Sequence, residues 1–174
     1  MSAMTEAPAA KAPEQAKQTE KLVIILCSGD LDKVWAAMII ATSGAAMGKE
    51  TSIFFTFWGF SALVKNDVRI TGDNWMQKML SLVNRPGDEH MKLSKMNFAG
   101  MGPAMLEHIA DEHHAALPHE LMATAKELGV RLLPCQMSMD LFGIKPDDLI
   151  DGVEAPVGAA TMLSLAEGAI TFFI

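Results

Sequence analysis

Two cysteines carry the most nucleophilic side chains of this sequence, and each stands at the end of an apolar run. Cys27 closes the run that begins at Leu22, and Cys135 follows the mostly apolar run from Val130 to Pro134. Continuous apolar runs of this length are typical of buried parallel strands. The carboxyl ends of such strands form the edge where open α/β folds bind ligands. The sequence therefore predicts two thiols at that edge of a sheet, where they could converge.

Cys135 is the stronger candidate for chemistry, because the polar stretch after it can open a helix. The positive end of a helix stabilises a thiolate, and the backbone N–H groups of Gln136 to Ser138 could contribute. The thiolate is the nucleophile in sulfur and disulfide exchange. We therefore predict a partly exposed, reactive sulfur at Cys135; the alternative is a small buried hydrophobic residue, as many free cysteines are. For Cys27 the structural role is favoured, and a resolving thiol is the alternative.

The elements that must position these thiols alternate between strands and helices. Strands are predicted at residues 22–27, 51–57, 130–134 and 169–174, with a further short strand at 151–154. Helices are predicted at residues 34–48, 75–83, 103–114, 119–128, 138–142 and 157–167. This alternation predicts an α/β fold: a parallel sheet of about five strands with helices on both faces, in three flavodoxin-like layers. Residues 65–102 are predicted to be an insertion that covers the site.

Length and composition indicate a single globular domain. The chain has 174 residues, of which 50% are hydrophobic and 20% charged. Its formal net charge of −7 argues against a nucleic-acid-binding face, which would be basic. Two cysteines do not make a disulfide scaffold, so we predict a reducing, cytoplasmic location. Residues 1–20 are predicted to be a disordered tail without the apolar stretch of a secretory signal, and residues 21–174 to form the domain.

The apolar content is high, and part of it is expected at a subunit interface. The predicted helix at 34–48 is apolar nearly all round, which favours burial on several sides. We therefore predict a homo-oligomer. No run reaches the roughly 18 uncharged apolar residues of a membrane span.

The remaining polar residues support weaker predictions. Gly29 gives the turn after the first strand its freedom, and Asp30 and Asp32 could cap the next helix. One glycine is neither a phosphate loop nor a dinucleotide fingerprint, so no nucleotide cofactor is predicted. Gly29, Asp30, Gln136 and Ser138 are the candidate residues that bind or position the sulfur.

Four histidines gather around one predicted helix end, but their spacing does not predict a metal site. Histidine pairs that bind metal share a helix face at i and i+4 spacing. Here the spacings are five, one and five, which favours solvated or interface histidines and no metal. The four are His108, His113, His114 and His119.

Four short segments give the chain a resemblance to a known family. They are Ser28 to Lys33, Phe54 to Gly59, Lys95 to Phe98 and Cys135 to Asp140. In this order they resemble the DsrE/DsrF-like family, in particular its second DsrE type, whose members are also described as peroxiredoxin-family proteins of sulfur relay. The resemblance covers about residues 20–174 and leaves the tail outside.

The resemblance implies a compact α/β subunit that oligomerises and a cysteine that carries sulfane sulfur as a persulfide. The family's carrier cysteine matches Cys135, whereas Cys27 is only a candidate secondary thiol because members vary at the end of the first strand. The implied partners are rhodanese-like sulfurtransferases and TusA-like sulfur carriers, and no cofactor is implied. The expected role is that of a sulfur carrier or sulfurtransferase-like protein rather than a turnover enzyme.

Two other functional classes stay open from the residues alone. A thiol peroxidase or disulfide oxidoreductase would need a partner thiol near Cys135, and the sequence has no Cys-x-x-Cys motif. A Cys27–Cys135 disulfide under peroxide would indicate this class. A non-catalytic assembly or membrane-peripheral subunit would use the apolar surplus for contact, and neither thiol would react.

Overall fold

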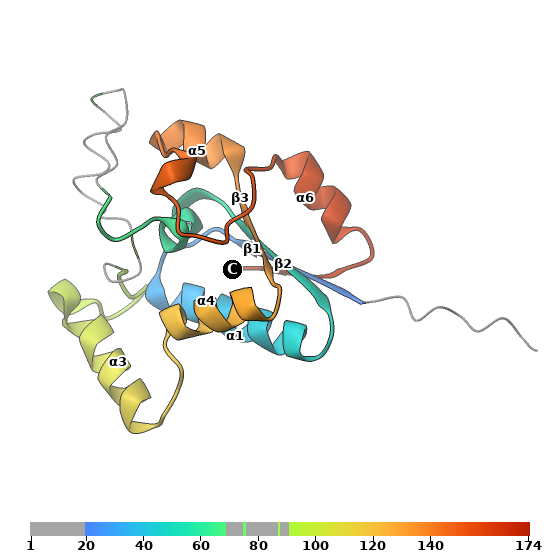
Figure 1. Ribbon diagram of the computed structural model, residues 1–174. Coiled ribbons are helices and arrows are strands. Elements are labelled where there is room, and N and C mark those ends of the chain that lie inside the picture. The colour runs from blue at the N-terminus through green and yellow to red at the C-terminus, as the bar shows by residue number, and fades with distance from the viewer. Residues whose placement is uncertain (1–19, 69–74, 76–86, 88–90) are drawn as a thin grey trace, which may run out of the picture.

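The strands form a four-stranded parallel sheet in the order β3-β2-β1-β4 (Figure 1). The structure is a computed structural model that describes residues 20–68, 75, 87 and 91–174. The strands are β1 (Lys21–Leu26), β2 (Glu50–Phe55), β3 (Arg131–Pro134) and β4 (Ile170–Phe173). The predicted α/β class and the four main strands are thus confirmed.

The helices connect these strands in the alternating order that the sequence predicts. The α-helices are α1 (Leu31–Ala46), α3 (Met101–Glu112), α4 (Pro118–Glu127), α5 (Gln136–Phe142) and α6 (Ala159–Ala166). The short 3-10 helices are η1 (Phe57–Leu63), η3 (Phe98–Gly100) and η4 (Pro146–Asp148). The predicted helix at 75–83 and the tail at 1–20 lie almost entirely outside the described residues. None of the described helices is long and apolar enough to span a membrane.

The sheet separates two layers of helices, as expected for three layers. Helices α1 and α4 lie on one face, and α5 and α6 lie on the other (Figure 1). Alternate residues of each strand point to opposite faces. Leu22 and Ile24 of β1 therefore join the larger core beneath α1, whereas Val23 joins the smaller core with Met162 of α6.

The predicted short strand at 151–154 is wrong, because this segment is a turn followed by an irregular stretch. It still runs along the free edge of β3: the Glu154 N–H donates to the Leu132 carbonyl at 3.0 Å, and the Val157 N–H donates to the Pro134 carbonyl at 2.9 Å. A longer ladder of hydrogen bonds between β3 and this segment would need a backbone N–H at residue 134, and proline has no N–H. The sheet consequently has four strands rather than about five.

Helix α1 is buried on one side rather than on several. Val34, Ala37 and Ala41 lie against the sheet and α4. Ile39 is 50% exposed, and Met47 just after the helix is 74% exposed. The apolar character of this segment therefore exceeds what its own fold buries.

Candidate functional site

Cys135 is the first residue after β3 and the N-cap residue of α5. Its N–H donates to the Phe55 carbonyl at 2.9 Å, and its carbonyl accepts from the Met139 N–H at 3.1 Å. The backbone is thus held by the sheet on one side and by the helix on the other. The residue is only 4% exposed and packs with Leu133 and Met162. The predicted partial exposure is therefore wrong, because α6 closes over this face of the sheet.

Polar groups nevertheless surround the sulfur. Burial raises the pKa of the Cys135 thiol, but four hydrogen-bonding groups outweigh it and hold this pKa below its usual value of 9.0. They are the hydroxyl and N–H of Ser138, the Thr56 hydroxyl and the Met137 N–H. A buried cysteine among apolar groups alone would show the opposite shift. We call Thr56, Cys135, Met137 and Ser138 the thiol site.

Ser138 connects the thiol site to the turn after β2. Its side chain is fully buried, and its Oγ accepts the Phe57 N–H at 2.9 Å and lies 3.3 Å from the Thr56 Oγ1. Because the Phe57 N–H occupies an acceptor position, the Ser138 proton stays free to donate to its neighbours. Phe57 has a φ of +45°, a conformation that is uncommon for an aromatic residue and that aims its N–H at Ser138.

Cys27, Thr56 and Cys135 form a row across the carboxyl edge of the sheet. Each directly follows a strand, and the ladder bonds continue past the strand ends: the Thr56 N–H donates to the Leu26 carbonyl, and the Cys135 N–H to the Phe55 carbonyl, both at 2.9 Å. The thiols therefore share an edge, as predicted, but β2 lies between them. Neighbouring strands are about 4.8 Å apart, which puts the two cysteine Cα atoms roughly 10 Å from each other.

Cys27 is half-buried and held by backbone contacts of its own. Its N–H donates to the Ile174 carbonyl at 2.7 Å, and its carbonyl accepts from the Gly59 N–H at 3.0 Å. The strand order reverses between β1 and β4, so Cys27 lies beside the switch point where open α/β sheets bind ligands.

The loop after Cys27 has a packing role rather than the predicted capping role. Asp30 occupies the N-cap position of α1, but its side chain makes no capping bond and accepts the Ser28 hydroxyl at 2.9 Å. Asp32 instead accepts the N–H and hydroxyl of Ser94 at 2.9 and 2.6 Å. Only glycine fits at position 29, because the backbone of Trp58 comes so close that a Cβ there would lie 2.4 Å from the Trp58 carbonyl oxygen.

Gln136 contributes less to the thiol site than the sequence suggests. Its backbone N–H donates to the Val157 carbonyl at 3.0 Å rather than to the sulfur. Its exposed side chain donates to Asp140 Oδ1 at 2.8 Å, one turn further along α5. Of the predicted N–H donors, Met137 and Ser138 face the thiol.

Thr56 is the residue that sequence reasoning missed. Nothing in its local pattern marks it, because a threonine at the end of a strand is common. The available signal was register: Thr56 follows β2 as Cys135 follows β3, and the two strands pair in parallel with Phe55 opposite Pro134.

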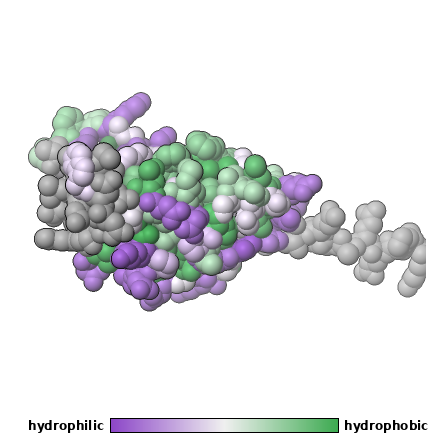
Figure 2. Space-filling model, turned by 90° about the horizontal axis from the view of Figure 1, so that it is seen from above, coloured by the Kyte–Doolittle hydropathy of each residue, from purple (hydrophilic) through white to green (hydrophobic). Residues whose placement is uncertain are grey.

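Exposed apolar side chains lie on η1 and α5, the two segments that begin directly after Thr56 and Cys135. Phe57 is 40% exposed, Trp58 45%, Met137 58% and Leu141 52%. We call these four residues the apolar rim. The Trp58 ring also packs against the Phe142 ring at a tilt of 37°, with ring centroids 5.0 Å apart, which joins η1 to α5. Figure 2 views the molecule from the side of α5 and α6 and shows apolar areas on this face.

The four histidines for which no metal site is predicted lie on the surface. All four are exposed, and His108 approaches Glu112 at 3.7 Å. Within the part of the chain that the structure describes, no three histidine, cysteine, aspartate or glutamate side chains lie close enough to hold a metal ion.

Comparison with known proteins supports the resemblance to the DsrE/DsrF-like family. The DsrE/DsrF/DrsH-like family matches residues 18–173. The chain is 40% identical to the uncharacterized protein YrkE of Bacillus subtilis, over 91% of this chain and 99% of that protein. It is 31% identical to the sulfur carrier protein DsrE2 of Allochromatium vinosum, over 90% of this chain and 99% of that protein.

A solved structure shares the fold. It is a protein of unknown function from Methanobacterium thermoautotrophicum, with a TM-score of 0.50 and 13% identity, over 89% of this chain and 99% of that one. This likeness concerns the fold alone. Because the family match spans nearly the whole sequence, the chain belongs to the DsrE/DsrF/DrsH-like family.

Proposed function

We propose that this protein is a cytoplasmic sulfur carrier that holds sulfane sulfur as a persulfide on Cys135. The observation that carries the proposal is the position of Cys135 at the junction of β3 and α5, where Thr56 and Ser138 lower the pKa of its buried thiol. Hydrogen bonds that lower a thiol pKa stabilise the thiolate, which is the form that attacks sulfane sulfur. The similarity to a protein named as a sulfur carrier supports the same role.

The transfer needs no cofactor or oxidant. The Cys135 thiolate attacks the outer sulfur of a donor persulfide, R–S–SH. The S–S bond of the donor breaks, a new S–S bond forms on Cys135, and the donor leaves as the thiolate R–S⁻. Discharge is the same exchange in reverse, with an acceptor thiolate attacking the outer sulfur of the Cys135 persulfide.

The partners proposed for this exchange are rhodanese-like and TusA-like proteins. A partner must reach the sulfur of a residue that is only 4% exposed, so its approach has to displace part of the α6 layer that packs over Cys135. The apolar rim is exposed apolar surface on η1 and α5, the segments that begin directly after Thr56 and Cys135. Exposed aromatic and methionine side chains are enriched at protein interfaces, which supports docking of a partner protein there.

The experiment is persulfide analysis of the intact protein and its two single-cysteine variants. After incubation with a sulfane donor, the wild-type protein and Cys27→Ser gain one sulfur, and Cys135→Ser gains none. Cys27→Ser is expected to load less than wild type. Tandem mass spectra must distinguish an added sulfur from two added oxygens, and circular dichroism controls for folding. A folded Cys135→Ser protein that still loads sulfur would move the carrier role to Cys27.

A further inference from the structure

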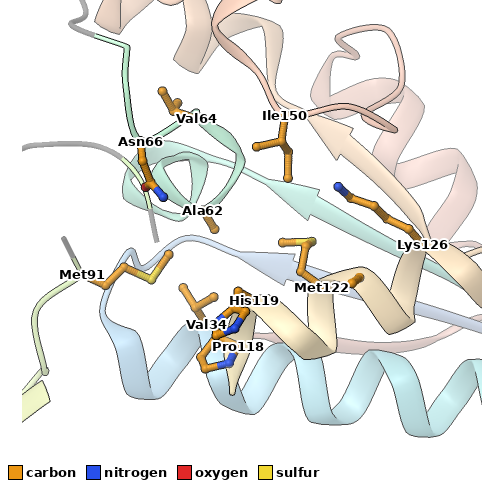
Figure 3. Close-up of a pocket in the computed structure, with 11 residues that line it drawn as sticks. Val34, Ala62, Val64, Asn66, Met91, Pro118, His119, Met122, Lys126 and Ile150 are labelled. Atoms are coloured by element: carbon orange, nitrogen blue, oxygen red, sulfur yellow. The ribbon is translucent and has the colours of Figure 1, made fainter. Parts of the chain in front are cut away.

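A cavity lies on the face of the sheet opposite the thiol site (Figure 3). It opens between α4, the start of α1 and the segment that follows η1, and its volume is about 220 Å³. Val34 and Met122 line it and belong to the larger core, whereas Cys135 belongs to the smaller core across the sheet. We call it the α4 cavity. The sheet therefore separates its contents from Cys135.

The wall of the α4 cavity is mostly apolar. Val34, Met91, Met122 and Ile150 supply aliphatic and thioether groups from four separate segments. An apolar cavity of about 150 Å³ is sufficient to bind benzene. The α4 cavity therefore has room for one ring or a short chain with a small substituent, and its two methionines can adapt their shape to such a guest.

Two cationic or potentially cationic side chains stand on the same wall. His119 and Lys126 lie seven residues apart on α4, on the face that also presents Met122 (Figure 3). Lys126 forms no ion pair with any residue that the structure describes. Its alkyl stem lies over Gly152, where an added Cβ would be 3.4 Å from the lysine Cδ. The stem is thus supported, while the ammonium group has no carboxylate partner among the described residues.

We propose that the α4 cavity binds a small organic carboxylate with an apolar body. The apolar wall would take the ring or chain, and Lys126, aided by His119, would take the carboxylate. The formal net charge of the chain is −7, so Lys126, which forms no ion pair with a described residue, is a local positive charge in an acidic protein. Such a ligand would be recognised by the positive charge of Lys126 at its carboxylate end and by burial of its apolar body against the cavity wall.

Phenylacetate and its neutral analogue phenylacetamide test this site in the full-length protein. With ¹³C-methyl-labelled methionine, phenylacetate is expected to shift the Met91 and Met122 methyl signals and to leave Met47 and Met137 unchanged. Phenylacetamide is expected to bind more weakly at the same methyl groups. An absence of shifts at Met91 and Met122 with both probes overturns the proposal.

Three variants separate the charge from the cavity. Lys126→Met should weaken phenylacetate binding by about twofold to fivefold, the range of a partly exposed ion pair, and leave phenylacetamide binding unchanged. Lys145→Met makes the same change in net charge at a residue that does not line the cavity and should change neither. Ala123→Phe, at an exposed position of α4 on the cavity wall, should abolish binding of both probes. Equal losses in the two lysine variants, or unchanged binding in Ala123→Phe, would refute the assignment.

Discussion

Cys27 and Cys135 follow β1 and β3 at the same edge of the sheet, with β2 and Thr56 between them. Their Cα atoms are separated by about two strand spacings, roughly 10 Å. A disulfide requires Cα atoms within about 7 Å. The two thiols therefore cannot bond to each other while the sheet is intact, which argues against an intrachain dithiol mechanism.

We predict that mild oxidation of the folded protein forms no Cys27–Cys135 disulfide. The same oxidation in urea should form it, because the unfolded chain can bring the two sulfurs together. Peptide mapping under non-reducing conditions measures both. The single Cys→Ser variants identify any disulfide between two chains. A Cys27–Cys135 peptide from natively folded protein would restore the oxidoreductase alternative.

Ser138→Ala is expected to raise the pKa of Cys135 by about one pH unit. A hydrogen bond to a charged group contributes about 1.5–3 kcal/mol, and one pH unit corresponds to about 1.4 kcal/mol. Thiolate absorbance against pH, with Cys135→Ser subtracted, measures the shift. Thr56→Val should raise the pKa less, since it removes one hydroxyl and leaves Ser138 in place. Unchanged titration in both variants would contradict the thiol site.

The same lowered pKa makes stability depend on pH. Because the folded-state pKa of Cys135 lies below 9.0, the thiolate stabilises the folded protein fully above that pH. This contribution is lost as the pH falls through the lowered folded-state value. Between these two pH values, the unfolding free energy of wild type should rise with pH relative to Cys135→Ser. Parallel curves for the two proteins in urea denaturation would argue against the shift.

Gly59→Ala is expected to destabilise the protein by about 1–3 kcal/mol, the usual range for overpacking. A Cβ at Gly59 would lie 2.2 Å from the Leu26 carbonyl oxygen, so η1 would have to move away from β1. Gly158→Ala is the control, because a Cβ there meets nothing within 4 Å. As an N-cap change it should alter stability by less than about 1 kcal/mol. Equal effects in urea unfolding would refute the packing argument.

The predicted homo-oligomer can be tested at β4, which lies at an edge of the sheet. Phe173 is 73% exposed, and Ile170 and Phe172 are 47% and 42% exposed. We expect light scattering at micromolar concentration to give a mass above the 18.8 kDa of one chain. Phe173→Lys should lower that mass, because it places a charge on the exposed apolar edge. Leu128→Lys, at the end of α4, is the control. A wild-type mass of one chain would rule out the oligomer.

The sequence by itself determined the class of fold and the places of its main strands. The run from Leu22 to Leu26 is entirely apolar, and the run from Val130 to Pro134 is apolar except for Arg131. Local runs of this kind are sufficient to predict a buried strand, and both runs form strands in the structure. For the same reason it placed Cys135 correctly at a strand-to-helix junction. The sequence could not exclude the fifth strand predicted at residues 151–154. That strand would have to pair with β3, and only the structure shows that the two segments are neighbours, so that the missing N–H of Pro134 limits their pairing.

Tertiary structure alone decided what surrounds each sulfur. The burial of Cys135 results from α6 packing over it, and the lowered pKa depends in part on Thr56, which is 79 residues away along the chain. The separation of the two thiols follows from the strand order, which inserts β2 between β1 and β3. These are contacts between segments distant in sequence, and no local pattern encodes which segments become neighbours.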